Sequence, residues 1–241
     1  MMTKNAAQRA VLGIVPARAG SKGIPGKNIR MMAGKSLLAY TAEAALGAAH
    51  LSRVLLSTDD PEIATIGRAS GLDTPFLRPS RLSLDSTPMI EVVLHCIEWV
   101  KNEGCQYDDV CVLQPTSPLR TSVTIDCCIS LLWETNADSV ISVRPVPTEY
   151  NPHWVYFKTP EGFLEPSVSR TVEIPSRQQL PLAYHADGSV FVARTQAVVE
   201  QHSLKGKRTR GWISPELEAA DLDTEEQWQM LERRIRSPKV R

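Results

Sequence analysis

A glycine-rich segment with several positive charges follows the first apolar run of the chain. The apolar run covers residues 11–15, and residues 16–28 read PARAGSKGIPGKN. Glycines let backbone N–H groups approach an anion closely, and Arg18, Lys22 and Lys27 add three cationic side chains. Clustered N–H donors and cations bind phosphate groups, so the segment indicates a phosphate-binding loop after a buried strand.

Two familiar nucleotide motifs do not fit this loop. Gly34, Lys35 and Ser36 resemble the end of a Walker A loop, but that motif needs a glycine where the chain has Ile29. The spacing of a GxGxxG dinucleotide motif is also missing from the sequence. Local pattern alone therefore leaves two interpretations, a phosphate loop of another type and a solvated basic loop.

Two further polar segments have side chains that could recognise an acid. Residues 114–120 read QPTSPLR, and their two prolines stiffen the loop that carries Gln114, whose amide both donates and accepts hydrogen bonds. Residues 177–181 read RQQLP, and the planar guanidinium of Arg177 suits bidentate binding of a carboxylate. Taken alone, these patterns also fit a proline-rich connection and a surface arginine.

An acidic pair near the end of the sequence could hold a metal ion. Asp221 and Asp223 are separated by one residue, so in an extended segment their carboxylates point to the same face. Carboxylate oxygens suit Mg²⁺, which is usually shared with substrate phosphates and water. The alternative is that Asp223 caps the helix that follows, since Glu226 comes three residues later.

Short apolar runs alternate with helical patterns along the chain. Strands are expected at residues 11–15, 53–56, 110–113, 139–143 and 189–193, and helices at residues 37–49, 87–100, 124–133 and 224–235. This order predicts an α/β, Rossmann-like, doubly wound and mainly parallel sheet. Ligands bind at the carboxyl ends of such strands. The loops after Val15, Leu56 and Leu113 should therefore line one pocket.

The proline-rich segment at residues 145–182 interrupts this alternation. It contains seven prolines and short aromatic or β-branched runs. We interpret it as an inserted arm of a single domain that comprises residues 1–241.

Charge and cysteine usage limit the partners and the compartment. Lysine plus arginine and aspartate plus glutamate each number 27, so no global charge draws the chain to nucleic acid or to a membrane surface. No apolar run approaches the roughly 20 residues of a membrane span. Five cysteines without metal-binding or CxxC spacing favour a reducing, cytoplasmic environment.

The loop at residues 16–28 resembles the CTP-binding signature of the acylneuraminate cytidylyltransferases (CMP-N-acetylneuraminic acid synthetases). The segments at residues 114–120 and 177–181 and the Asp-x-Asp of residues 221–223 resemble further signatures of that family, in the same order. The resemblance implies transfer of CMP from CTP to the anomeric hydroxyl of a sialic acid or related nonulosonic acid, with release of pyrophosphate. It also implies cell-surface glycan biosynthesis and a homodimer in which the arm reaches toward the partner.

The resemblance assigns roles to individual residues. The set implied for CTP is Arg18, Ser21, Lys22, Lys27, Asn28 and Arg78. The set implied for the sugar acid is Gln114, Arg177, Gln178, Asp187 and Phe191. Mg²⁺ is assigned to Asp221 and Asp223, and catalysis to Arg18, Lys22, Asp221 and Asp223. The general base remains open.

Two positions depart from the family pattern. Asp187 and Phe191 stand where the family usually has asparagine and tyrosine, which leaves the identity of the sugar open. Two alternatives remain: a cytidylyltransferase for an eight-carbon keto-sugar acid, whose family residues 25–27 also resemble, and a non-catalytic homologue that binds a nucleotide.

Overall fold

The computed structural model describes residues 9–20, 23–168, 174, 176–220 and 222–237. Ser21, Lys22 and Asp221, which the sequence assigns to the site, lie outside the described residues. The chain divides into two compact units. The first unit comprises Met1–Ser142 and Gly188–Arg241, and the second comprises Val143–Asp187.

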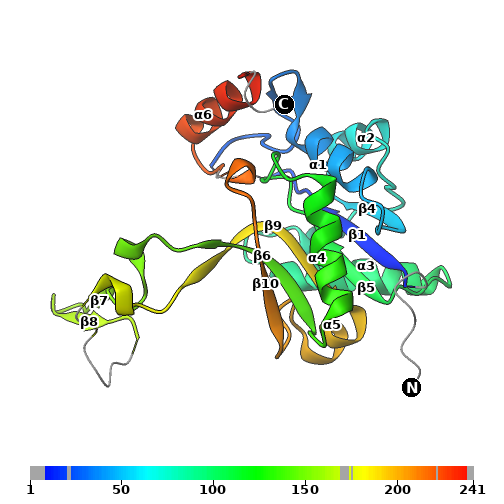
Figure 1. The fold of residues 1–241 in the computed structure, drawn as a ribbon. Coiled ribbons are helices and arrows are strands. Elements are labelled where there is room, and N and C mark those ends of the chain that lie inside the picture. The colour runs from blue at the N-terminus through cyan, green and yellow to red at the C-terminus, as the bar shows by residue number, and fades with distance from the viewer. Residues whose placement is uncertain (1–8, 21–22, 169–173, 175, 221, 238–241) are drawn as a thin grey trace. The chain divides into compact units, whose positions relative to one another are not determined.

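A six-stranded sheet forms the centre of the first unit (Figure 1). Its strands are β1 (Val11–Pro16), β4 (Arg53–Ser57), β5 (Asp109–Val112), β6 (Ser139–Pro145), β9 (Tyr184–Arg194) and β10 (Thr209–Ile213), in the spatial order β10-β6-β9-β5-β1-β4. β1 pairs in parallel with β4 and β5, so that Ile14 lies between Leu55 and Val112. All of β1 is buried, as expected for a parallel strand covered on both faces. The mainly parallel, Rossmann-like fold is confirmed.

One strand runs against the expected doubly wound order. β9 pairs antiparallel with β5, and Val110 lies opposite Ala193. A crossover helix would return the chain to the opposite end of the sheet and make the strand parallel. Among the described residues between β6 and β9 there is no such helix, and the strand runs in the opposite direction. β10 was not expected from the sequence, because its residues are mostly exposed and form no apolar run.

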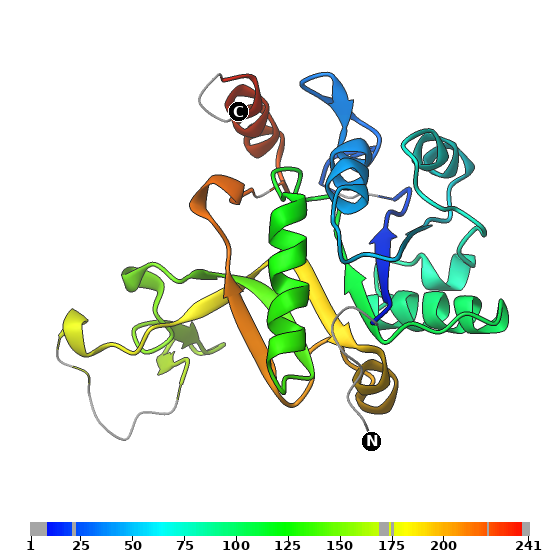
Figure 2. The same cartoon turned by 45° about the vertical axis from the view of Figure 1, so that its right-hand side comes forward.

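Helices cover both faces of the sheet (Figure 2). They are α1 (Leu37–Leu46), α2 (Pro61–Ala69), α3 (Met89–Asn102), α4 (Ser122–Glu134), α5 (Thr195–Gln201) and α6 (Glu225–Arg236). Alternate residues of β1 point to opposite faces: Val11 and Val15 join the core beneath α1 and α4, and Leu12 and Ile14 join the core beneath α3 and α5. In the described part of the chain, no helix is both long enough and apolar enough to cross a membrane.

Side-chain caps fix the starts of two helices. The Asp60 carboxylate accepts hydrogen bonds from the N–H groups of Glu62 and Ile63 at the start of α2. Thr224 and Gln227 form a capping box at the start of α6. The start of α6 therefore fixes the backbone directly after Asp223.

A small third core joins α6 to the loop that follows β1. Its buried members are Ile24, Met32, Leu37, Leu222, Trp228 and Leu231. The guanidinium of Arg30 binds both carboxylate oxygens of Glu225 at 2.5 and 2.6 Å and lies over the ring of Trp228. The hairpin of β2 (Met31–Met32) and β3 (Lys35–Ser36) also contacts α6, because the N–H of Ala33 donates to Glu232. The Asp223 segment is thus packed against the glycine-rich loop.

The second unit contains little regular structure. β7 (Tyr156–Lys158) and β8 (Leu164–Pro166) form an antiparallel hairpin, and short 3-10 turns cover Thr148–Tyr150 and Arg177–Gln179. The side chain of Asn151 donates to the carbonyl of Pro181, which ties the two ends of the unit together. Few apolar side chains are buried here, and several large ones are exposed.

Candidate functional site

A cleft of about 330 Å³ lies in the first unit, where β1 and β5 end. Among the described residues, its lining is Pro16, Arg18, Gly23, Lys27, Asn28, Arg78, Met89, Gln114, Pro115, Thr116 and Asp223. Six of these residues are among those that the sequence assigns to the site. The cleft thus brings the glycine-rich loop, the QPTSPLR segment and one member of the acidic pair to the same edge of the sheet.

The glycine-rich loop is held in a folded-back shape by its own backbone. The side-chain amide of Asn28 is buried and donates to the carbonyl of Arg18 at 3.0 Å. Gly26 has a φ of +61°, a conformation that favours glycine, and its carbonyl accepts from the N–H groups of Ile29 and Arg30. Asn28 therefore fixes the loop as well as lining the cleft.

Lys27 connects this loop to the segment that contains Asp223, here called the acidic segment, near the other end of the chain. Its ammonium donates to the carbonyl of Leu222 at 2.6 Å and lies 3.5 Å from the Asp223 carboxylate. The backbones also approach closely, since a Cβ on Gly23 would lie 2.5 Å from the carbonyl oxygen of Asp223. The Asp223 side chain itself is 80% exposed and lines the cleft. A cationic loop and a solvent-accessible carboxylate therefore meet there.

Two arginines add positive charge to the cleft. Arg78 is buried, its Nε donates to Ser83 Oγ at 3.1 Å, and its Nη2 lies 3.6 Å from the Asp59 carboxylate. Burial lowers the pKa of Arg78 from its usual value, yet arginine stays protonated in proteins. Arg18 is partly exposed and forms an ion pair with Asp85. These guanidinium groups make the cleft suitable for an anion.

The loop after β5 carries Gln114 into the cleft. Arg120 is buried, and its Nη1 donates to the carbonyl groups of Gln114 and Ser189 at 3.2 and 2.6 Å. These bonds fix the backbone that positions the Gln114 amide. Gly188 lies next to this amide, since a Cβ there would be 3.9 Å from Gln114 Oε1.

The other residues assigned to the sugar acid are not among the described residues that line the cleft. Arg177 and Gln178 occupy an exposed turn of the second unit. Asp187, also in that unit, is 2% exposed, and its carboxylate lies 3.8 Å from Arg144 Nε. Phe191 on β9 packs against the core beneath α3. Their role in sugar binding stays a prediction.

Comparison with known proteins identifies the family. Residues 12–160 match the model of the family described as Cytidylyltransferase. The chain belongs to the cytidylyltransferase family. The enzyme is 32% identical, over 92% of its own length and 95% of the relative's, to the CMP-N,N'-diacetyllegionaminic acid synthase of Legionella pneumophila. It is 29% identical to a pseudaminic acid cytidylyltransferase of Campylobacter jejuni, over 88% of this chain and 90% of that protein.

One further sequence relative and two solved structures also resemble the enzyme. The enzyme is 28% identical to the N-acylneuraminate cytidylyltransferase of Escherichia coli O18:K1:H7, over 88% of this chain and 49% of that protein. A solved CMP:2-keto-3-deoxy-manno-octonic acid synthetase superposes with a TM-score of 0.68 at 16% identity, covering 95% of this chain and 98% of that one. A solved 4-diphosphocytidyl-2C-methyl-D-erythritol synthase of Anaerococcus prevotii gives a TM-score of 0.66 at 13% identity, covering 97% and 100%. These structures agree with the fold, and the family confirms the resemblance seen in the sequence.

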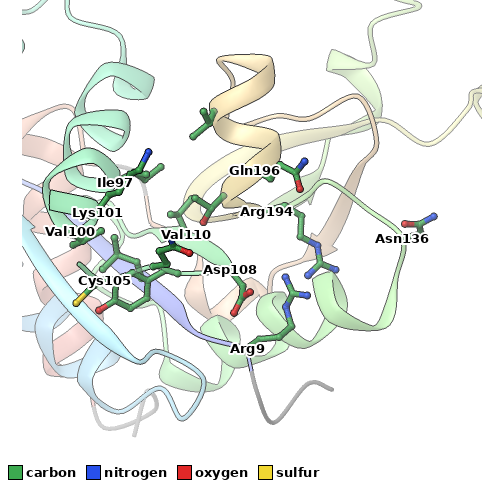
Figure 3. A pocket seen from close by; sticks show the side chains of 15 residues that line it. Arg9, Ile97, Val100, Lys101, Cys105, Asp108, Val110, Asn136, Arg194 and Gln196 are labelled. Atoms are coloured by element: carbon green, nitrogen blue, oxygen red, sulfur yellow. The ribbon is translucent and has the colours of Figure 1, made fainter. Parts of the chain in front are cut away.

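A larger cavity of about 700 Å³ lies elsewhere in the enzyme (Figure 3). It lies where β1 and β5 begin, whereas ligands of such sheets bind where parallel strands end. Its two arginines, Arg9 and Arg194, both bind the buried carboxylate of Asp109, at 2.8 and 3.3 Å. Asp109 also accepts from the ring N–H of Trp133. Arg9 and Arg194 thus form a buried ion-pair network with Asp109. The smaller cleft, which lies where the parallel strands end, is therefore the better candidate for the active site.

Two carboxylates near the cleft were not predicted from the sequence. Asp59 accepts from the N–H of Ala19 at 3.3 Å and lies near Arg78. It lies two residues after the strand at residues 53–57, so its place at the carboxyl edge of the sheet could have revealed it. Asp85 pairs with Arg18. No local pattern marks Asp85, because its partner is distant in the sequence.

Proposed function

We propose that the enzyme transfers CMP from CTP to the anomeric hydroxyl of a nonulosonic acid and releases pyrophosphate. One observation carries the proposal: the cationic glycine-rich loop and the exposed Asp223 carboxylate meet in one cleft at the carboxyl edge of the sheet. The substrate class is supported by relatives named for legionaminic, pseudaminic and N-acylneuraminic acids.

The chemistry is an in-line substitution at phosphorus. The anomeric oxygen of the sugar acid forms a bond to the α-phosphorus of CTP, and the bond from that phosphorus to the bridging oxygen breaks, so that pyrophosphate leaves. The hydroxyl proton goes to a base that we leave unassigned. The protein's main tasks are to position both substrates and to neutralise charge. We assign Arg18, Arg78 and Lys22 to the triphosphate and Gln114 to the sugar acid.

The acidic segment fits a magnesium ion. The Asp223 carboxylate offers hard oxygen donors, is largely exposed and lines the cleft. Among the described residues, no group of three or more acidic, histidine or cysteine side chains could hold a metal. Mg²⁺ commonly binds through one or two carboxylates together with substrate phosphates and water. Asp223, with Asp221, would hold the ion, which when bound would offset negative charge on the phosphates.

A pyrophosphate-release assay tests the proposal. The purified protein is supplied with CTP, Mg²⁺ and, in separate reactions, N-acetylneuraminate, legionaminate, pseudaminate and the eight-carbon octulosonate. We expect pyrophosphate and a CMP-sugar with at least one nine-carbon acid. Turnover with the octulosonate alone would establish that the enzyme is a cytidylyltransferase for an eight-carbon keto-sugar acid. Binding of CTP without turnover of any acid would establish a non-catalytic homologue.

The free cysteines support a cytoplasmic location, which we also propose. None of the five cysteines, all of which the structure describes, forms a disulfide. Burial raises the pKa of both Cys96 and Cys111 to about 12, so these thiols stay protonated and unreactive. Cysteines that form no disulfide are typical of proteins in a reducing compartment.

We further propose that the second unit forms a homodimer interface. Its exposed large apolar side chains include Tyr150, Phe157, Phe163, Leu164 and Leu182. So many exposed apolar groups in one small unit are typical of an interaction surface. A second copy of the chain is the partner that the family resemblance implies.

A double variant, Phe157→Asp with Phe163→Asp, is expected to shift the protein from dimer to monomer, because charge would replace the apolar contact. Sedimentation velocity measures the change. Val123→Asp is the matched control, since Val123 on α4 of the first unit is 67% exposed and Phe163 is 73% exposed. The control should remain dimeric. A monomeric wild type, or a dimeric double variant, would rule out this interface.

A further inference from the structure

The loop that precedes α3 contacts both arginines of the cleft. Ser83 Oγ accepts from Arg78 Nε at 3.1 Å, and the Asp85 carboxylate forms an ion pair with Arg18 Nη1. Both arginines line the cleft, whereas Asp85 is not among the described residues that line it. The Asp85 carboxylate therefore binds the guanidinium from outside the space that a ligand would occupy.

The side chains of Arg18 and Arg78 differ in the contacts that restrict their movement. The Arg78 side chain is 3% exposed, so packing fixes it, and Asp59 and Ser83 add polar contacts. The Arg18 side chain is 33% exposed and has much less packing around it. A long, exposed side chain samples many rotamers, and binding a ligand must remove that freedom. The ion pair with Asp85 restricts that freedom before a ligand binds.

A guanidinium can serve two anions at once. Its five N–H donors form a planar fork, and the contact with Asp85 engages Nη1. Donors on the rest of the fork stay available for phosphate oxygens in the cleft. The Asp85 charge also offsets part of the repulsion that would otherwise act between Arg18 and the neighbouring Arg78.

From these contacts we infer that Asp85 is a positioning residue, which holds the Arg18 guanidinium in the orientation that binds the triphosphate of CTP. The inference rests on the proposed function, since it needs CTP in the cleft. It assigns Asp85 no contact with the reacting atoms.

The first experiment measures CTP affinity directly. Asp85→Ala should weaken CTP binding about 10-fold, by analogy with other residues that orient a ligand-binding side chain, and should raise the KM for CTP by a similar factor. The KM for the sugar acid should not change, because Arg18 is assigned to the nucleotide. Asp85→Asn should lie between wild type and Asp85→Ala, since the amide keeps a hydrogen-bond acceptor without the charge. Calorimetry gives the affinity, and pyrophosphate release gives the two KM values.

A double-mutant cycle shows whether Asp85 acts through Arg18. If it does, Asp85→Ala should weaken CTP binding in the wild type and have no further effect in an Arg18→Ala background. Additive losses would overturn the inference. Asp73→Ala is the matched control: Asp73 pairs with Arg53 away from the cleft, and its side chain is 41% exposed, like that of Asp85. This control should bind CTP as the wild type does.

The outcomes separate this inference from the proposed function. A wild type that releases no pyrophosphate with any sugar acid would refute the proposed function. An active wild type together with an Asp85→Ala variant of unchanged CTP affinity would overturn the role of Asp85 alone. If Asp85→Ala does not fold, Asp85→Asn decides the question, because the amide is nearly identical in shape to the carboxylate.

Discussion

Asp223→Asn is expected to lower kcat/KM by about 10²- to 10³-fold, the range seen when an enzyme loses one group that stabilises charge in the transition state. Asp223 is the one carboxylate among the described residues that line the cleft, and its side chain is mostly exposed. The amide keeps the size of the side chain but is a much weaker ligand for Mg²⁺. The variant should therefore need more Mg²⁺ for half-maximal activity, which a Mg²⁺ titration of pyrophosphate release measures.

A neighbouring carboxylate provides the control for this variant. Glu226 lies in the first turn of α6 and is exposed, and it is not among the described residues that line the cleft. Glu226→Gln makes the same chemical change and should leave both kcat/KM and the Mg²⁺ requirement near their wild-type values. An Asp223→Asn variant with the wild-type Mg²⁺ curve would end the assignment of Asp223 to the metal.

Local sequence patterns predicted the strands and helices whose formation depends on residues close together in the chain. The apolar run at residues 11–15 became the fully buried strand β1, and the helix expected at residues 224–235 is α6, Glu225–Arg236. A general rule of topology predicted the position of the site, because the carboxyl ends of parallel strands meet at one edge of the sheet. That rule suffices to bring Arg18, after β1, near Gln114, after β5.

Features that depend on long-range contacts could not be predicted in the same way. The direction of β9 depends on where the second unit returns the chain, and its residues alone would suit either direction. The resemblance assigned Lys27 to CTP, and the structure adds hydrogen bonding to Leu222, near the other end of the chain. Likewise, Asp187 was noted as a departure from the family pattern, and only the structure reveals Arg144 as its ion-pair partner.

The contact between Gly23 and Asp223 leads to the second large expected effect. Gly23→Ala should lower kcat/KM by roughly 10²-fold, because misplacing catalytic groups by about 1 Å can cost that much. The new Cβ would lie 2.5 Å from the backbone carbonyl of Asp223, so the glycine-rich loop and the acidic segment must move apart. That movement would stretch the contact of Lys27 with Leu222 and displace the Asp223 carboxylate from the cationic loop. Steady-state pyrophosphate release and calorimetry with CTP measure the loss.

Gly20→Ala separates this steric effect from a general loss of loop flexibility. Gly20 belongs to the same loop, and a Cβ there would have no heavy atom within 4 Å. Both substitutions remove a similar amount of backbone freedom from the unfolded chain, so only the contact with Asp223 distinguishes them. Gly20→Ala should therefore keep nearly full activity. Equal losses in the two variants would show that the loop needs flexibility at both glycines, and that the close approach of Gly23 to Asp223 is not what aligns the cationic loop with the acidic segment.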